Sequence, residues 1–145
     1  MRVVALDLGS RRIGVAVSDA GQVLASLRPH LVRTRDTAAD HRRIAVLVAE
    51  EEAGLVLVGL PVSLDGTEQA AARAARAESE ALAALLEPEG VGVELCDERF
   101  TTVDAHRLLA ERGLDSRARR TMVESAGAAV MLQAWLDARR PPAPP

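Results

Sequence analysis

Two carboxylates follow apolar stretches of the sequence, at points where strands are expected to end. Asp7 interrupts the apolar run of residues 3–8, and Glu98 comes shortly after a second run at residues 91–96. Ligands of open α/β sheets lie beyond the carboxyl ends of the strands, so both positions are candidates for a site. Two carboxylates that approach each other repel unless a cation lies between them, which would indicate a divalent metal.

Each of these carboxylates also has a purely structural interpretation. Asp7 can begin an Asx-type turn into Gly9. The run Asp97-Glu98-Arg99 can be a solvated loop, and for these residues taken singly the loop is the favoured interpretation. On position alone, the sequence leaves both alternatives open.

A third carboxylate, Glu124, stands at the start of the last predicted helix. The pattern Thr121-Met-Val-Glu124 matches a capping box, in which the glutamate binds back to the N-cap residue. In isolation this pattern favours capping. Small residues follow at 125–129, and such a run allows a helix to lie close to a sheet or a ligand, or to pack tightly in a core.

Other kinds of chemistry have weaker support. The stretch 59–68 after a predicted strand has backbone amides that could hold a phosphate, but it matches neither GxxxxGK[ST] nor GxGxxG. The three histidines show no metal-ligand spacing, and we interpret them as surface or helix residues: His30, His41 and His106. The single cysteine excludes intrachain disulfides and Cys-rich zinc sites.

Charge and composition exclude several classes of protein. The chain has 145 residues, a size typical of one domain, and a net charge of −3, so no global field attracts polyanions. All basic side chains are arginines, which we attribute to the lysine-poor composition that a GC-rich genome produces. Local basic patches could still form at residues 11/12, 33/35, 42/43 and 117/119/120. Phe100 and Trp135 are the two aromatic residues, too few for a protein that stacks bases on aromatic platforms.

The hydrophobic pattern predicts elements in the order βββ-α-β-α-β-α-α. Strands are expected at 3–8, 13–18, 23–27, 55–58 and 91–96, and helices at 37–52, 68–86, 101–112 and 121–138. Short links make the first three strands an antiparallel meander, whereas the last two return parallel through helices, with the fifth strand expected beside the first. The fold class is therefore α/β: a five-stranded mixed sheet flanked by about four helices in one domain, residues 1–140. A disordered, Pro-rich tail is expected at 141–145.

Four segments together resemble the YqgF/RuvX family along nearly the whole globular part of the chain. They read ALDLGSRRIGVAVSD, VGLPVSLDGTEQ, CDERFTTVDA and RTMVESAGAAVMLQAWL, in the family's order and at its usual spacing. The resemblance implies the RNase H-like fold of the Holliday-junction resolvase superfamily. It also implies endonuclease activity, chiefly maturation of the 5′ end of pre-16S rRNA in ribosome biogenesis, with Holliday junction resolution in DNA recombination as the alternative.

The resemblance implies a catalytic role for the same three carboxylates. Asp7 corresponds to the first-strand catalytic residue and Glu98 to the acidic residue of the DER motif, while Glu124 stands where the family usually has aspartate. Together they are expected to hold Mg²⁺ or Mn²⁺, with two ions about 4 Å apart and Asp7 bridging both. The departure at Glu124 lengthens that ligand by one methylene group.

Arginines near these carboxylates are expected to bind the substrate. Arg99 or Arg120 would steady the scissile phosphate, and Arg11 with Arg12 would hold a neighbouring one. The expected partner is thus nucleic acid, either pre-rRNA or branched DNA. The N-terminus has no signal-peptide pattern and no apolar run approaches the length of a membrane span, so we expect a cytoplasmic protein without a membrane partner; a homodimer is left open.

Two functions from other classes share part of these features. The actin-like ATPase and sugar-kinase superfamily opens with a similar hairpin, but it binds ATP between two such domains, so this chain would need a homodimer or a partner. The second is a non-catalytic RNA- or ribosome-binding module that kept the fold. ATP titration separates the first from a nuclease, and equal RNA binding without cleavage by the wild type and an Asp7→Asn variant would support the second.

Overall fold

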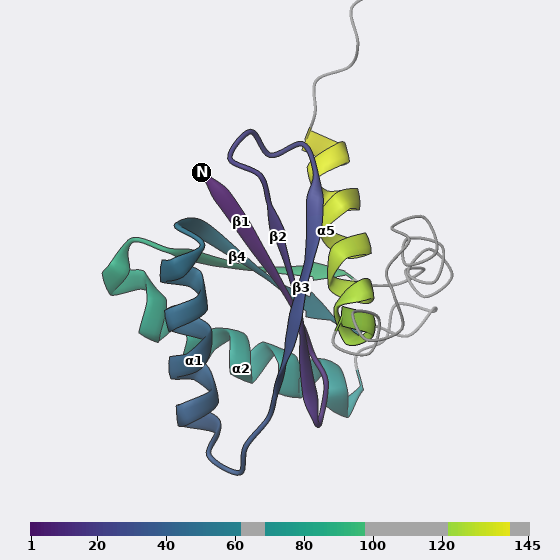
Figure 1. The fold of residues 1–145 in the computed structure, drawn as a ribbon. Helices are drawn as coiled ribbons and strands as arrows, with labels where there is room; N and C mark the ends of the chain where they lie inside the picture. Colours follow the sequence, from purple (N-terminus) through teal and green to yellow (C-terminus); the bar gives the residue numbers. More distant parts are fainter. Residues whose placement is uncertain (62–68, 98–121, 140–145) are drawn as a thin grey trace, which may run out of the picture.

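A five-stranded sheet lies at the centre of the computed structural model, which describes residues 1–61, 69–97 and 122–139 (Figure 1). The strand order is β3-β2-β1-β4-β5. β1, β2 and β3 are antiparallel neighbours, whereas β4 runs parallel to β1 and β5 parallel to β4. The strands are β1 (Arg2–Leu8), β2 (Arg12–Ser18), β3 (Ala25–Val32), β4 (Ala53–Leu60) and β5 (Gly92–Asp97). The predicted mixed sheet, a meander followed by two parallel strands, is confirmed.

The expected position of the fifth strand beside the first is wrong. β2 pairs with one side of β1 and β4 with the other, so β5 can pair only with the free edge of β4. The register then sets the levels along the sheet: Leu6 pairs with Val58, and Cys96 pairs with the next residue of β4, Gly59. The end of β5 is therefore level with Asp7 but one strand further away.

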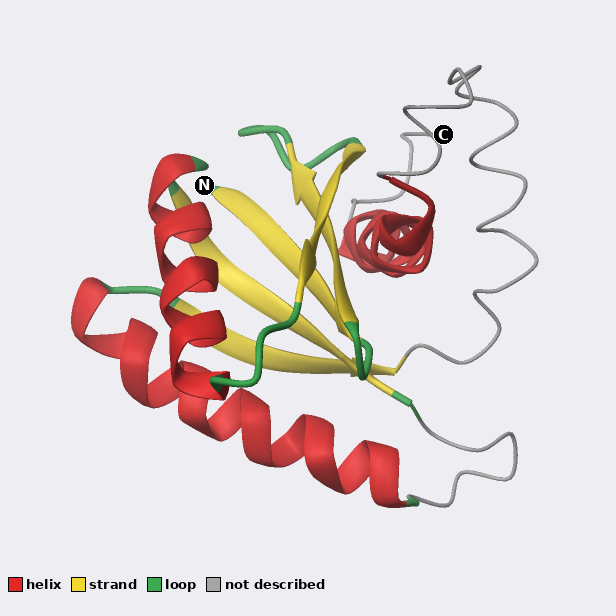
Figure 2. Cartoon of the chain, turned by 60° about the horizontal axis from the view of Figure 1, so that its bottom comes forward, coloured by secondary structure: helices red, strands yellow, loops and turns green. Residues whose placement is uncertain are grey.

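Helices cover both faces of the sheet (Figure 2). Two helices, α1 (Thr37–Glu50) and α2 (Ala70–Leu86), lie on one face, with the short η1 (Glu87–Glu89) after the second. On the other face lies α5 (Ala126–Arg139), which the short 3₁₀ turn η2 (Val123–Ser125) precedes. The helix predicted at 101–112 and the tail at 141–145 lie outside the described residues.

The core follows from the alternation of side chains along β1. Val3 and Ala5 point toward α5, whereas Val4 and Leu6 point toward α1 and α2, and all four are fully buried. Asp7 continues the first series and so faces α5. No helix in the described part of the chain is long and apolar enough to cross a membrane.

The boundaries of β3 and α1 differ from the sequence prediction. β3 was expected at 23–27, yet it continues through Pro29 to Val32. Pro29 is tolerated because β3 is an edge strand, and the register with β2 shifts between Ile13 and Val15. The first helix ends at Glu50, two residues before the predicted end.

Ser125 fastens the start of α5 to the sheet. Its hydroxyl accepts a hydrogen bond from the backbone N–H of Val15 (2.9 Å) and donates one to the carbonyl of Arg28 (2.6 Å). Gly14 lies below this junction, and any side chain on it would collide with the backbone carbonyl of Glu124. The bare backbone of Gly14 therefore lets the last helix begin in contact with β2.

We predict that Ser125→Ala destabilises the fold by about 2–3 kcal/mol, because it leaves a buried N–H and a buried carbonyl without their partner. Urea unfolding monitored by circular dichroism measures this loss. Ser79→Ala is the matched control: its hydroxyl is also buried, but it donates only to Arg76 within the same helix (2.8 Å), so we expect less than about 1 kcal/mol. Equal losses in the two variants would contradict the role given to Ser125.

Candidate active site

Asp7 lies at the carboxyl end of β1, where the sheet meets the first turn of α5. Its side chain is partly buried, and its carbonyl accepts a hydrogen bond from Gly9 N–H (3.0 Å) that closes the turn toward β2. A methyl group at Gly127 would lie only 3.1 Å from Asp7 Oδ2. The glycine therefore leaves room for the carboxylate against the helix, as the small-residue run 125–129 allowed.

Glu124 lies at the same corner. Gly14 is the cross-strand partner of Asp7, and the backbone of Glu124 rests directly on Gly14. The Glu124 carboxylate forms an ion pair with Arg12 (3.6 Å), and both side chains are about half exposed, at 46% and 50%. Thr121, the other member of the predicted capping box, lies outside the described residues.

The structure thus brings together part of the predicted site. Asp7, Glu124 and Arg12 meet at one corner, and Arg11 is exposed in the adjacent turn. Three predicted site residues lie outside the described residues: Glu98, Arg99 and Arg120. The last described residue before them, Asp97, ends β5 in register with Leu60.

The chemistry of this corner suits a hard divalent cation. Asp7 and Glu124 offer carboxylate oxygens, which Mg²⁺ and Mn²⁺ prefer. Within the ranges that the structure describes, no three His, Cys, Asp or Glu side chains cluster closely enough to hold an ion. The third predicted ligand, Glu98, lies outside those ranges. Asp7 and Glu124 therefore fit the role of two ligands out of three.

A buried polar cluster that the sequence did not indicate supports the turn beside Asp7. Arg33 donates from Nε to the Gly9 carbonyl (2.7 Å) and from Nη2 to Glu78 (2.6 Å). His41 Nε2 bonds to the other Glu78 oxygen (2.8 Å). The side chains of Arg33, Glu78 and His41 are 14%, 20% and 9% exposed, so three elements are joined under the turn.

His41 is therefore a buried helix residue rather than a surface one. The helical pattern alone did not show whether His41 is buried or exposed, because its hydrogen-bond partner Glu78 is 37 residues away on another helix. Burial alone would raise the pKa of Glu78, but the hydrogen bonds from Arg33 and His41 and their nearby charge outweigh it and lower the pKa below its usual value.

Comparison with known proteins decides the family. Residues 1–138 match the family described as "RuvX: Holliday junction resolvase". The chain belongs to this family. A RuvX-family relative from Anaeromyxobacter sp. (strain Fw109-5), named "Putative pre-16S rRNA nuclease", is 47% identical over 140 residues, covering 96% of this chain and 98% of the relative. A relative of the same name from Myxococcus xanthus is 43% identical over 142 residues, covering 98% and 91% of the two chains.

Solved structures support the RNase H-like resolvase fold of this RuvX-family chain. T. thermophilus RuvC in complex with a Holliday junction substrate superposes with a TM-score of 0.56 at 17% identity, covering 96% of both chains. The yeast mitochondrial Holliday junction resolvase Ydc2 gives a TM-score of 0.50 at 11% identity, covering 95% of this chain and 81% of that one. The expected family and fold are confirmed.

For this RuvX-family chain we predict that Glu78→Gln lowers the free energy of unfolding by about 2 kcal/mol at pH 7, because the charge of Arg33 loses its partner. Since folding lowers the pKa of Glu78 below its usual value of 4.5, its contribution to stability is complete above that value and is lost as the pH falls through the lower pKa of the folded state. The gap between wild type and variant should therefore narrow below about pH 4.

Urea titrations at pH 7 and at about pH 3 measure that gap. Glu80→Gln, an exposed position on the same helix, is the control, and we expect a change within about 0.5 kcal/mol at either pH. A gap for Glu78→Gln that stays constant between the two pH values would show that its charge does not stabilise the turn.

Proposed function

We propose that this chain is a divalent-metal-dependent endonuclease that processes the 5′ end of pre-16S rRNA in ribosome biogenesis. The observation that carries the proposal is the juxtaposition of Asp7 and Glu124: the backbone of Glu124 rests on Gly14, the cross-strand partner of Asp7. Membership of a family of nucleases and resolvases gives the reaction class, hydrolysis of a phosphodiester. The names of the relatives support rRNA as the substrate.

The chain's own residues have distinct roles in this proposal. Asp7 and Glu124, together with Glu98, would hold Mg²⁺ or Mn²⁺. A metal bound there would supply an activated water molecule and stabilisation of negative charge on the leaving oxygen. Asp7 is suited to this role because it lies on the rigid end of β1, with its turn supported by Arg33.

Arginines would position the phosphates around the cleavage site. Arg12 is half exposed, and an exposed ion pair such as that with Glu124 contributes at most about 1 kcal/mol, so a phosphate can displace it at little cost. Arg11, exposed in the same turn, would bind the neighbouring phosphate. Arg99 or Arg120 is proposed for the scissile phosphate itself.

We predict that Asp7→Asn lowers cleavage of a pre-16S rRNA leader by on the order of 1,000-fold or more, because it removes a carboxylate proposed to bind the metal. The fold should persist with a melting temperature within about 3 °C of the wild type, or slightly above it, because a repelling carboxylate is gone. The assay compares wild type and variant with Mn²⁺ or Mg²⁺ and with EDTA, which should stop the wild type as well.

The same assay with a synthetic four-way DNA junction separates the two substrates that the comparisons name. Cleavage of the rRNA leader alone supports rRNA processing, and cleavage of the junction alone supports a resolvase. Unchanged cleavage by Asp7→Asn, or cleavage in EDTA, would overturn the mechanism. RNA binding without cleavage by either protein would indicate a binding module.

We predict that Glu124→Gln nearly abolishes cleavage while it changes stability by only a few tenths of a kcal/mol. Glu124→Asp restores the family's usual residue with a shorter reach, so we expect partial or full activity and a changed preference between Mg²⁺ and Mn²⁺. Arg12→Gln is the comparison, because it breaks the same ion pair and leaves the carboxylate in place. As Arg12 is proposed to bind a phosphate, this variant should raise KM, while kcat falls far less than in Glu124→Gln. A Glu124→Gln protein that cleaves normally would show that this carboxylate only caps the helix.

A further inference from the structure

Arginines that are scattered along the sequence gather at one end of the molecule. Arg12 pairs with Val32 across the β2–β3 ladder, and the Val32 carbonyl accepts a hydrogen bond from Arg43 (2.7 Å). The backbone of Arg33 donates to the carbonyl of Arg11 (2.8 Å). Three of the arginine clusters that we attributed to composition are therefore adjacent in the structure, at the end of the sheet that carries Asp7.

We propose that a group of three arginines at this end, Arg35, Arg42 and Arg43, binds the phosphate backbone of a double-helical arm of the substrate, outside the cleavage site. We call this group the α1 arginines. None of them belongs to the catalytic corner, since α1 lies on the face of the sheet opposite α5 (Figure 2). This proposal rests on the proposed nuclease function, because it assumes that the nucleic acid extends from a cleavage site at Asp7 toward α1.

The α1 arginines are available to a ligand. Arg42 is 64% exposed, and its contact with Asp36 is a loose 4.0 Å. Arg43 is 42% exposed and faces Asp40 (3.4 Å), but Asp40 is fully buried and already accepts hydrogen bonds from the backbone and hydroxyl of Thr34. No carboxylate in the described part of the chain forms an ion pair with Arg35, which is exposed in the segment before α1.

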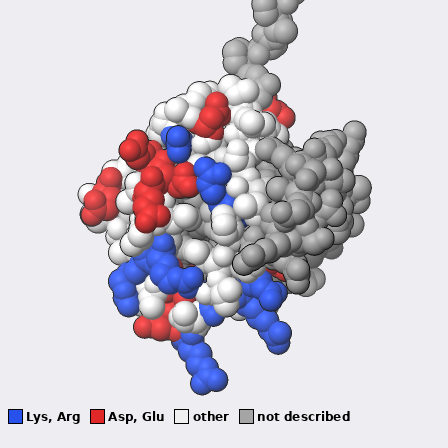
Figure 3. Space-filling model, viewed as in Figure 1, with Lys and Arg blue, Asp and Glu red and all other residues white. Residues whose placement is uncertain are grey.

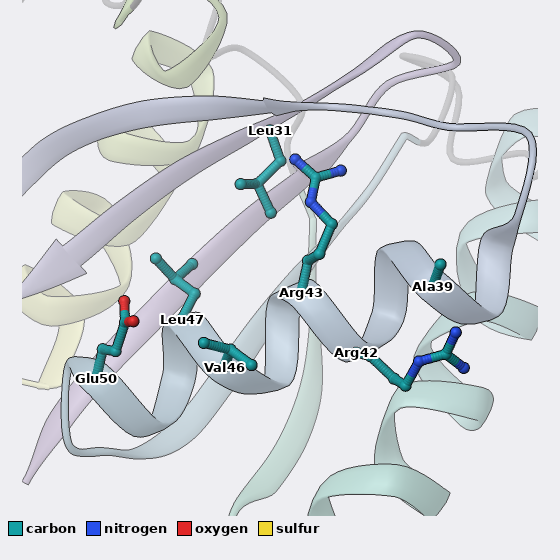
Figure 4. Close-up of a pocket in the computed structure, with 7 residues that line it drawn as sticks. All are labelled: Leu31, Ala39, Arg42, Arg43, Val46, Leu47 and Glu50. Atoms are coloured by element: carbon teal, nitrogen blue, oxygen red, sulfur yellow. The ribbon is translucent and has the colours of Figure 1, made fainter.

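Figure 4 shows how two of these arginines leave the helix. They border a groove of about 450 Å³ between α1 and the edge strand β3: Arg43 reaches toward β3, whereas Arg42 points away from β3. The floor is apolar, with Leu31 and Leu47, and Glu50 closes the far end. The groove contains no aromatic side chain on which a base could stack, and its arginines suit phosphate oxygens.

The distribution of acidic residues orients the ligand. The C-terminal end of α1 carries two exposed glutamates, Glu50 and Glu52, which would repel phosphates; Glu51 between them is paired with Arg2 and Arg28. Arginines protrude at the lower end of the view in Figure 3 and acidic side chains gather above them, so the net charge of −3 conceals an uneven distribution. On the face that Figure 3 shows, a polyanion is therefore favoured across the N-terminal end of α1, which lies at the same end of the sheet as the β1–β2 turn.

The spacing of the layers sets the length of nucleic acid required. β3 lies two strands from β1, which is about 10 Å, and α1 packs a further layer away, so the α1 arginines are on the order of 15 Å from Asp7. At about 3.4 Å per base pair, this distance corresponds to roughly four to five base pairs. A shorter arm would reach only Arg11 and Arg12.

The test measures binding, so that it does not depend on cleavage. Asp7→Asn protein, as the full chain, is titrated with pre-16S rRNA hairpins whose duplex arm extends about 3 or about 12 base pairs beyond the cleavage position, at several salt concentrations. We expect Arg42→Gln with Arg43→Gln to weaken binding of the long-arm RNA about 10-fold to 100-fold and to lower the salt slope by about 2. Binding of the short-arm RNA should change less than about 2-fold.

Two further variants control for fold and for total charge. Arg139→Gln removes an equally exposed arginine from the C-terminal end of α5, at the opposite end of the molecule, and should leave both affinities unchanged (Figure 1). Arg42→Gln alone breaks only the loose contact with Asp36 and should still lower the salt slope by about 1.

Three results would overturn the proposal: an equal loss for both arms, no loss for either, or a similar loss in Arg139→Gln. The failure of the proposed function has a different signature. In that case the wild type cleaves neither RNA, while the difference between long-arm and short-arm binding still tests the α1 arginines.

Discussion

The close approach of the last helix to the first two strands is the contact on which the site depends. Gly14 provides the space, because any Cβ there would collide with the carbonyl of Glu124. Ser125 then fixes the contact by hydrogen bonds to two strands at once. With the start of α5 held in this way, Glu124 lies beside the cross-strand pair of Asp7 and Gly14. Two residues more than a hundred positions apart thereby share one corner.

On the other side of the sheet, a second set of contacts holds the same corner. Arg33 reaches the carbonyl of Gly9 from below, and Glu78 and His41 keep its guanidinium in place. The Asp7 turn is thus held between a neutral, close-packed helix on one face and a charged, hydrogen-bonded cluster on the other. Such double support suits a carboxylate that must keep its geometry when strongly charged ligands bind.

Local patterns in the sequence predicted the strands, the mixed sheet and the position of Asp7 well. An aspartate at the end of a fully apolar run is conspicuous, and a run of small residues at 125–129 indicated close packing of the last helix. The order of β4 and β5 was wrong because it depends on which sheet edge remains free, and no local pattern contains that information. The roles of Glu98, Arg99 and Arg120 remain predictions.

The long-range pairings were beyond such patterns for a related reason. His41 and Glu78 are each ordinary residues of an amphipathic helix, and only the packing of two helices makes them partners. The arginines illustrate the same limit. The number of arginines in the sequence reflects composition alone. Residues 11/12, 33/35 and 42/43 form one basic surface only because the strands and α1 bring them together.

The hydrogen bond between Val15 and Ser125 also has a consequence for synthesis of the chain. It joins residues 110 positions apart, so it cannot form until Ser125 has emerged from the ribosome. Until then the face of the sheet that includes Val3, Ala5 and Leu57 has no helix to cover it, and Asp7 has no Glu124 beside it. The nascent chain therefore carries an incomplete candidate site until that point of translation. Glu124 can take its place beside Asp7 only when the start of α5 has emerged from the ribosome.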